Sequence, residues 1–197
     1  MKVSASDSPP ILDISPSTTA EFRDVFDGAY FQSMVKAKKT VKFLYCLLSC
    51  DGVVAAHKSK RQVIWPVTLA VLNLEPRLRR KFENMILVML FYGTKNPEFM
   101  EFMKEVVAVI EATSLEFQGS IVRIRIVALV ADLPAKAACL NMTQFNSYYP
   151  CIFCEVKGTY LLESHKMTYS PTICKSRSVS PHSEHARSGS NKKQVVA

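Results

Sequence analysis

The chain has 197 residues, of which 48% are hydrophobic, and a formal net charge of +8. This length and composition allow one sizeable buried core, and they exclude wholesale disorder. The apolar runs are much shorter than the roughly 20 residues of a membrane-spanning helix, and residues 1–10 contain no secretory signal. We therefore expect a soluble, intracellular protein that is neither secreted nor held in a membrane.

Composition divides the chain into four segments. Residues 1–20 are rich in Ser and Pro and are predicted to be a flexible lead-in. Residues 21–145 carry the long apolar runs and form the predicted core. Residues 146–174 contain two closely spaced cysteines, and residues 175–197 are predicted to be a disordered basic tail.

Four apolar runs in the core predict β-strands, and one periodic stretch predicts a helix. The helix spans Pro97–Thr113, where apolar residues recur at helical spacing opposite charged ones. The strands are predicted at Val41–Cys50, Gln62–Asn73, Asn84–Tyr92 and Ile121–Ala131. This order indicates an α/β fold with a mixed sheet, in which three strands pair antiparallel and a fourth strand follows the helix.

Proline and glycine signals add detail to these strands. Asp51-Gly52 suits a tight hairpin turn after the first strand. Pro66 lacks a ladder donor, so it indicates a strand start or an edge strand. The fourth strand is rich in Val and Ile, which is typical of a strand buried on both faces. Pro134 then opens a helix that we predict over Ala135–Met142.

Two carboxylates, Asp51 and Asp132, each follow a predicted core strand. If the first and fourth strands are neighbours, the two side chains meet at one edge of the sheet. Such a pair can hold Mg²⁺ or Mn²⁺, which prefer oxygen ligands and serve phosphodiester chemistry. The alternative is that Asp51 belongs to a hairpin turn and Asp132 caps a helix, and spacing alone leaves both open.

Six cysteines suggest two different uses. Cys46, Cys50 and Cys139 lie in apolar elements and are predicted to be core residues. Cys151 and Cys154 have the spacing of half a Zn²⁺ site, which would need two further ligands. Candidates for these ligands are Cys174 and one of His165, His182 and His185.

Basic residues outside the tail form two short clusters that predict a DNA-binding surface, and with it a nuclear location. An ordinary solvated surface is the alternative. The candidate residues are Lys58, Lys60, Arg61, Arg77, Arg79, Arg80 and Lys81. No glycine-rich nucleotide-binding motif occurs in the sequence, so we expect no small-molecule cofactor.

An ordered set of short motifs over residues 22–160 resembles the CACTA (En/Spm-type) DDE transposases and related transposase-like proteins of animals. The set includes Phe26-Asp-Gly-Ala-Tyr-Phe, Cys50-Asp-Gly-Val, Ile64-Trp-Pro-Val, Phe91-Tyr-Gly-Thr-Lys-Asn-Pro, Ala131-Asp-Leu-Pro-Ala-Lys-Ala and Tyr149-Pro-Cys-Ile-Phe-Cys. The resemblance implies an RNase H-like core, with Asp51 and Asp132 as the first two catalytic carboxylates. It also implies that Cys151 and Cys154 belong to a zinc-binding segment inserted after the second Asp.

The sequence departs from this family at the third catalytic carboxylate. The family places that residue on a later helix, whereas the basic tail stands in this position here, and Glu163 and Glu184 have no matching context. The resemblance therefore implies a transposon-derived core that is truncated at its C-terminal end and catalytically incomplete alone. The alternative is a domesticated DNA- or chromatin-binding module without catalytic activity, of unknown oligomeric state.

Overall fold

A computed structural model describes residues 24–36, 42–57, 60–117, 119–170 and 174–177. The predicted lead-in at 1–20 and most of the predicted tail lie outside the described residues, as does Lys58. In the part of the chain that is described, no helix is long and apolar enough to cross a membrane.

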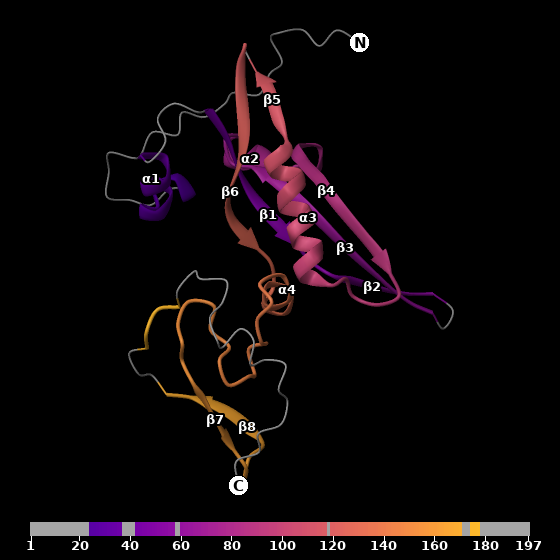
Figure 1. Cartoon of the computed structure of the whole chain (residues 1–197), viewed down its shortest axis with the longest axis vertical. Coiled ribbons are helices and arrows are strands. Elements are labelled where there is room, and N and C mark those ends of the chain that lie inside the picture. Colours follow the sequence, from indigo (N-terminus) through magenta and orange to yellow (C-terminus); the bar gives the residue numbers. More distant parts are fainter. Residues whose placement is uncertain (1–23, 37–41, 58–59, 118, 171–173, 178–197) are drawn as a thin grey trace.

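The described residues form a mixed α/β fold around one large twisted sheet (Figure 1). The strands of this sheet are β1 (Lys42–Cys50), β2 (Val53–His57), β3 (Lys60–Val71), β4 (Met85–Gly93), β5 (Ser114–Phe117) and β6 (Ser120–Val130). The helices are η1 (Val25–Asp27), α1 (Ala29–Lys36), α2 (Pro76–Arg79), η2 (Phe82–Asn84), α3 (Phe99–Ala112) and α4 (Leu133–Cys139). A separate hairpin consists of β7 (Gly158–Leu161) and β8 (Lys166–Tyr169).

The predicted sheet arrangement is confirmed at the level of strand pairing. Strands β1, β3 and β4 pair antiparallel in that order, and β6 lies on the other side of β1 and runs parallel to it. Short strand β5 pairs with β6 at one edge, and β2 pairs with the first half of β3. The first and fourth predicted strands are therefore neighbours.

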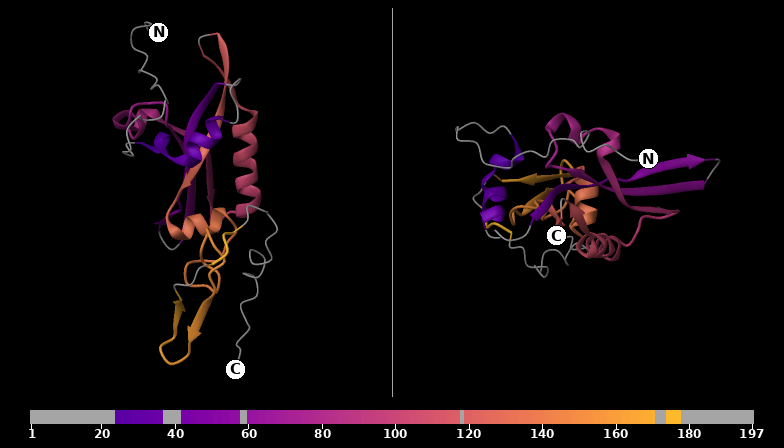
Figure 2. Two further views of the ribbon diagram at one scale, coloured as in Figure 1. Left: turned by 90° about the vertical axis from the view of Figure 1, so that its left-hand side faces the viewer. Right: turned by 90° about the horizontal axis from the view of Figure 1, so that it is seen from above.

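Opposite faces of the sheet pack against different helices, because side chains alternate along each strand (Figure 2). On β1, Cys46 and Leu48 join the core beneath α3, together with Phe102 and Val106 of that helix. Tyr45, from the other face of β1, packs with Phe26, Phe31 and Leu72 in a second cluster. The ring centroids of Phe31 and Tyr45 are 4.8 Å apart. Helix α3 thus covers one face of the sheet and α1 the other, and β1 is buried between them.

Strand β6 does not have the predicted burial on both faces. Val122 is buried, but Arg123, Ala128 and Val130 are exposed. Two features explain the difference: β5 pairs only with residues 120–123, so the rest of β6 has no neighbouring strand on that side among the described residues, and α1 covers only part of the second face. The Val/Ile-rich run therefore predicted the strand correctly, but the prediction that both of its faces are buried was wrong.

Two predictions about the first hairpin were also wrong. Asp51-Gly52 does not form the hairpin turn. It separates β1 from β2, which both pair with β3, and the chain reverses only after His57. Pro66 lies inside the central strand β3, between β4 and the β1–β2 side. The interruption explains why a proline is tolerated there, because Pro66 lies between the paired positions Ile64 and Val67, opposite Asp51-Gly52.

The interruption at Asp51-Gly52 also accommodates the indole ring of Trp65. A Cβ atom on Gly52 would lie 2.5 Å from Cζ2 of Trp65, far inside contact distance. Trp65 is buried, stacks edge-on against Phe99 of α3, and donates a hydrogen bond from Nε1 to Oδ1 of Asn96 at 3.3 Å. Glycine is therefore required at position 52 by packing.

The C-terminal part of the described chain differs from prediction in two places. Helix α4 ends at Cys139, earlier than the predicted Met142, because Asn141 adopts a left-handed conformation with φ of 50°. Beyond it, the β7–β8 hairpin forms in the 146–174 segment, where no strand was predicted. Figures 1 and 2 show it extending past α4, away from the sheet.

We predict that Gly52→Ala destabilises the fold by about 1–3 kcal/mol, because the added methyl group overpacks the Trp65 ring. Urea denaturation followed by far-UV circular dichroism measures the change. In a Trp65→Phe background the same substitution should cost less, since the smaller ring leaves room for the methyl group. An equal cost in both backgrounds would show that the contact with Trp65 is not the cause.

Candidate functional site

Asp51 and Asp132 lie at the carboxyl ends of the neighbouring parallel strands β1 and β6. The last pair in the register of these strands is Ser49 with Val130, and each aspartate follows two residues later. Because parallel strands advance together, the two side chains reach the same edge of the sheet at the same level. The expectation that they meet at one edge is thus supported by the register.

Both carboxylates line one open cavity of about 190 Å³. Its wall is built from four parts of the fold: the end of β1, the β2–β3 hairpin, the loop between β4 and α3, and the start of α4. The lining residues are Asp51, Gly52, Val54, Arg61, Val63, Trp65, Asn96, Asp132, Pro134 and Ala135. Sequence reasoning missed Trp65 and Asn96 as part of this site, although both lie in motifs of the transposase resemblance, because those motifs supply no carboxylate. Arg61 was predicted, but as part of a DNA-binding surface.

Each aspartate accepts a hydrogen bond from a nearby backbone amide. Oδ1 of Asp132 accepts from the Ala135 amide at 2.7 Å and caps the N-terminus of α4, so the helix-cap interpretation of this residue is confirmed. Oδ1 of Asp51 accepts from the Gly52 amide at 2.7 Å. These bonds fix the orientation of both carboxylates, and both side chains remain exposed to solvent.

Two buried thiols, one of them next to Asp51 in the chain, lie in the core beside the site. Cys50, the residue before Asp51, is hydrogen-bonded to Cys139 at the end of α4, and this bond together with burial raises the pKa of Cys50. Burial raises the pKa of Cys46 to about 12. All three cysteines are buried in the main core, so the prediction that they are core residues is confirmed.

The donor set of the cavity suits a hard cation but is small. Two carboxylates supply the oxygen ligands that Mg²⁺ and Mn²⁺ prefer. Among the described residues, no group of three or more His, Cys, Asp or Glu side chains is placed to hold a metal ion. Glu163 lies in the exposed turn of the β7–β8 hairpin, and Glu184 is outside the described residues. The carboxylates of the cavity lining are therefore Asp51 and Asp132.

The segment with Cys151 and Cys154 folds back against residues 174–177. Cys154 forms an isolated antiparallel bridge with Ser176, and the amide of Glu155 donates to the carbonyl of Lys175 at 2.9 Å. This pairing brings Cys174 close enough to affect the pKa of Cys154. The Val156 amide lowers this pKa, but Cys151, partial burial and Cys174 together raise it overall. The three cysteines thus lie at one end of the segment.

The surroundings of Cys151 favour its thiolate form. Partial burial raises the pKa of Cys151, but the amides of Phe153 and Cys154 and the charge of Arg177 lower it overall. The Phe153 amide donates to Sγ of Cys151 at 3.4 Å. His165 lies in the turn at the far end of the hairpin, where its Nδ1 contacts the Tyr160 hydroxyl. A Zn²⁺ site at Cys151 and Cys154 stays a prediction, and His165 is not placed to complete it.

The basic residues predicted to bind DNA do not form one surface. Arg61 is exposed near the start of β3, whereas Arg77, Arg80 and Lys81 are exposed around α2, beyond the end of the same strand. β3 has 12 residues, so its ends are about 35 Å apart. Figure 1 shows α2 and the β2–β3 hairpin at opposite ends of the sheet. The side chain of Lys60, like Lys58, is outside the described part.

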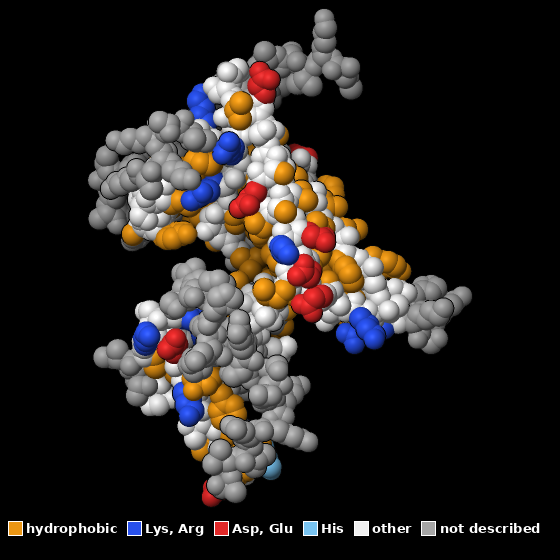
Figure 3. Space-filling model, in the orientation of Figure 1, with side chains coloured by type: hydrophobic (Ala, Val, Ile, Leu, Met, Phe, Trp, Pro, Cys, Tyr) orange, Lys and Arg blue, Asp and Glu red, His pale blue; other side chains and the backbone are white. Residues whose placement is uncertain are grey.

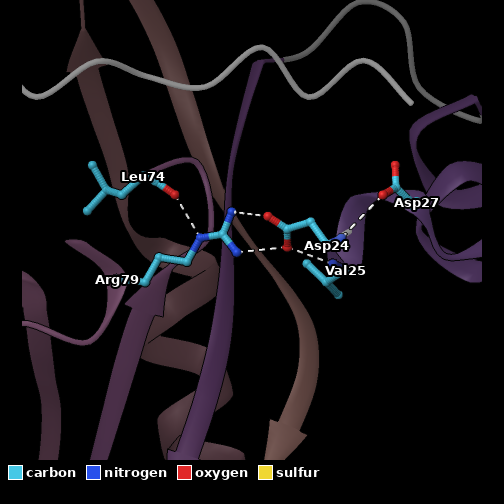
Figure 4. A network of polar contacts seen from close by, with 5 residues as sticks. All are labelled: Asp24, Val25, Asp27, Leu74 and Arg79. Atoms are coloured by element: carbon cyan, nitrogen blue, oxygen red, sulfur yellow. Dashed lines mark hydrogen bonds and ion pairs between the residues drawn. The ribbon is translucent and has the colours of Figure 1, made fainter. Parts of the chain in front are cut away.

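Arg79 has a structural role that was not predicted from the sequence. Its guanidinium makes a bidentate ion pair with Asp24, with distances of 2.8 and 2.6 Å, and its Nε donates to the Leu74 carbonyl at 2.7 Å (Figure 4). The group also lies over the ring of Phe26, 5.2 Å from the centroid. Only 12% of the Arg79 side chain and 20% of the Asp24 side chain are exposed. Arg79 therefore attaches η1 to α2, and we remove it from the candidate DNA-binding residues.

Comparison with known proteins places the chain in a family whose function is not known. Residues 16–195 match the family described as "Protein of unknown function (DUF1258)". The chain belongs to the DUF1258 family. None of the curated proteins matches it.

We predict that Arg79→Ala lowers the free energy of unfolding by about 2 kcal/mol, because it removes a partly buried, bidentate ion pair and leaves Asp24 without it. Arg79→Lys should also be destabilising, since an ammonium group cannot make the two parallel hydrogen bonds. Arg77→Gln and Arg80→Gln are matched controls, with expected changes within about 0.5 kcal/mol. Equal unfolding midpoints for all four variants in urea would contradict this assignment.

Proposed function

We propose that this DUF1258 protein is a transposon-derived, RNase H-like core of the DDE transposase type, and that it is catalytically incomplete alone. Asp51 and Asp132 are its remaining carboxylates and bind one Mg²⁺ or Mn²⁺ ion weakly. The observation that carries the proposal is that both residues end adjacent parallel strands and line one cavity. The order of strands, three antiparallel followed by a helix and a parallel fourth, supports the same ancestry.

The environment of the two aspartates fits a role with nucleic acid. A divalent cation bound there would lower the pKa of a bound water or polarise a phosphate oxygen, whereas activation of the nucleophile together with stabilisation of the leaving oxygen is the chemistry of two such ions. Asp51 and Asp132 would hold the cation, while Arg61 places a positive charge at the same cavity and can bind a phosphate group. Trp65 and Asn96 form the wall between the β2–β3 hairpin and α3, and a hydrogen bond joins them.

Among the described residues, the site nevertheless lacks what strand cleavage and transfer require. DDE chemistry uses three carboxylates, and two described ones line the cavity. The hydrogen bonds that the two aspartates accept from the Gly52 and Ala135 amides also give both a role in the fold that does not need a cation. Residual metal binding without efficient DNA cleavage is therefore the activity that we assign.

A DNA-binding module without catalytic ancestry is less well supported. Its residues are divided between the two ends of β3, and Arg79 is engaged in the ion pair with Asp24. Among the described residues, each remaining cluster contains few exposed cations, and a small number of phosphate contacts gives only weak binding without sequence preference.

We predict that isothermal titration detects one Mn²⁺ site per chain in the wild-type protein, with an affinity weaker than about 10⁻⁴ M because the ion has only two charged ligands. Asp51→Asn and Asp132→Asn should each abolish the heat of binding. Asparagine retains the ability to cap α4, so Asp132→Asn removes the charge while it preserves the fold.

Glu111→Gln is the matched control, because it removes an exposed carboxylate near the C-terminal end of α3, away from the cavity. It should leave the titration unchanged. Wild-type binding that persists in both aspartate variants would locate the ion elsewhere and would contradict the proposal, as would an absence of Mn²⁺ binding at millimolar concentration.

A further inference from the structure

Two side chains that line the cavity of Asp51 and Asp132 bring hydrogen-bond donors to it. Arg61 comes from the start of β3, and Asn96 comes from the loop between β4 and α3. The two aspartates supply acceptors, so the described lining combines acceptors and donors in one cavity. A cation on the aspartates accounts for the acceptors. It does not account for Arg61, because a cation repels the guanidinium group.

The guanidinium group of Arg61 is available to a ligand. Arg61 is exposed, and Figure 3 shows basic surface at the β2–β3 hairpin that is labelled in Figure 1. Within the described residues no carboxylate forms an ion pair with Arg61, and this includes Asp51 and Asp132. Arg79, by contrast, is held by Asp24. Arg61 can therefore donate two parallel hydrogen bonds to a phosphate group.

The hydrogen bond from Trp65 determines which end of the Asn96 amide is free. The indole Nε1 is a donor only, so Oδ1 of Asn96 is the atom that faces it, at 3.3 Å. The other end, Nδ2, donates to no residue in the described part of the chain, and Asn96 is exposed. With its oxygen engaged and its N–H groups free, Asn96 suits an anionic acceptor better than a cation.

The charge of the lining makes anion binding depend on a cation. Asp51, Asp132 and Arg61 give the described lining a net charge of −1, which repels a phosphate group. A divalent cation on the two aspartates changes this net charge to +1. Each phosphate of a nucleic-acid backbone carries a single negative charge. Such a phosphate therefore complements the cation-bound cavity and is disfavoured in the empty one.

The size and walls of the cavity favour one phosphate of a longer strand. Pockets that enclose whole small-molecule ligands have volumes of about 300–1,000 Å³, whereas this open cavity has about 190 Å³. It therefore accommodates one group of a ligand that extends beyond it. Trp65 is only 8% exposed and packs edge-on against Phe99, so its ring is not available to stack on a base.

We propose that Arg61 and Asn96 position a backbone phosphate of a nucleic-acid strand in this cavity, and that the strand binds together with the cation on Asp51 and Asp132. The binding of the phosphate rests on the proposed function, because it requires that cation. The ion and Arg61 bind phosphate oxygens, and Nδ2 of Asn96 donates to one of them. Contacts to the backbone alone carry no sequence information, so every base sequence should bind equally.

The test is the affinity of the full chain for a short, fluorescein-labelled oligothymidylate, measured by fluorescence anisotropy in Mn²⁺ and in EDTA at equal ionic strength. Mn²⁺ should tighten binding to the wild-type protein by about tenfold. Ordinary electrostatic binding to basic residues changes in the opposite direction, because added cations compete for the phosphates. A mixed-sequence strand of the same length should show the same gain.

Arg61→Gln and Asn96→Ala should each weaken binding in Mn²⁺ by about tenfold, because each removes hydrogen bonds to a charged group. Arg77→Gln is the matched control, since it removes an exposed cation at the opposite end of β3, and it should retain the gain. Arg61 is exposed, so its variant retains the fold, which circular dichroism checks.

The Mn²⁺ affinity of Arg61→Gln separates phosphate binding from cation binding. Isothermal titration of this variant should show tighter Mn²⁺ binding than in the wild type, because a positive charge near the ion is removed. Mn²⁺ bound at the aspartates without a gain in strand affinity would overturn this proposal alone. A gain that survives Arg61→Gln or Asn96→Ala, an equal loss in Arg77→Gln, or a dependence on base sequence would do the same. An absence of Mn²⁺ binding would overturn both proposals.

Discussion

The parallel pairing of β1 with β6 is the constraint on which the rest of the structure depends. Two parallel strands cannot be joined by a tight turn, so the chain between them must cross over the sheet. Here that connection contains β2, β3, β4 and α3, and α3 packs over the face that holds Cys46, Leu48 and Val67. The same pairing brings the ends of β1 and β6 together, and with them Asp51 and Asp132.

Residues in the motifs around the two aspartates have structural functions that do not depend on catalysis. Gly52 makes room for Trp65, Asp132 caps α4, and the buried Ala135 supplies the capped amide. The chain would therefore need much of these motifs in order to fold, whether or not the two aspartates bind a cation. The proposed ancestry rests on the motifs, whereas any present-day activity depends on the chemistry of the cavity.

The sequence predicted the main strands and α3, because long apolar runs and helical periodicity are strong local signals. It placed Asp51 and Asp132 together only on the condition that the first and fourth strands are neighbours. It did not predict features that depend on contacts distant in the chain. Arg79 belongs to a basic cluster in the sequence, yet its partner Asp24 is far from it along the chain. Pro66 was expected at an edge, because nothing local shows that β1 and β2 are interrupted opposite it. The β7–β8 hairpin was missed because its strands are short and largely exposed.

The most direct test of the account is the anomalous scattering from a crystal of the full chain grown with Mn²⁺. The account predicts one anomalous peak within coordination distance of the carboxylates of both Asp51 and Asp132, at the ends of β1 and β6. A structure in which the two strands are not neighbours, or in which the only ordered Mn²⁺ lies away from this cavity, would contradict it.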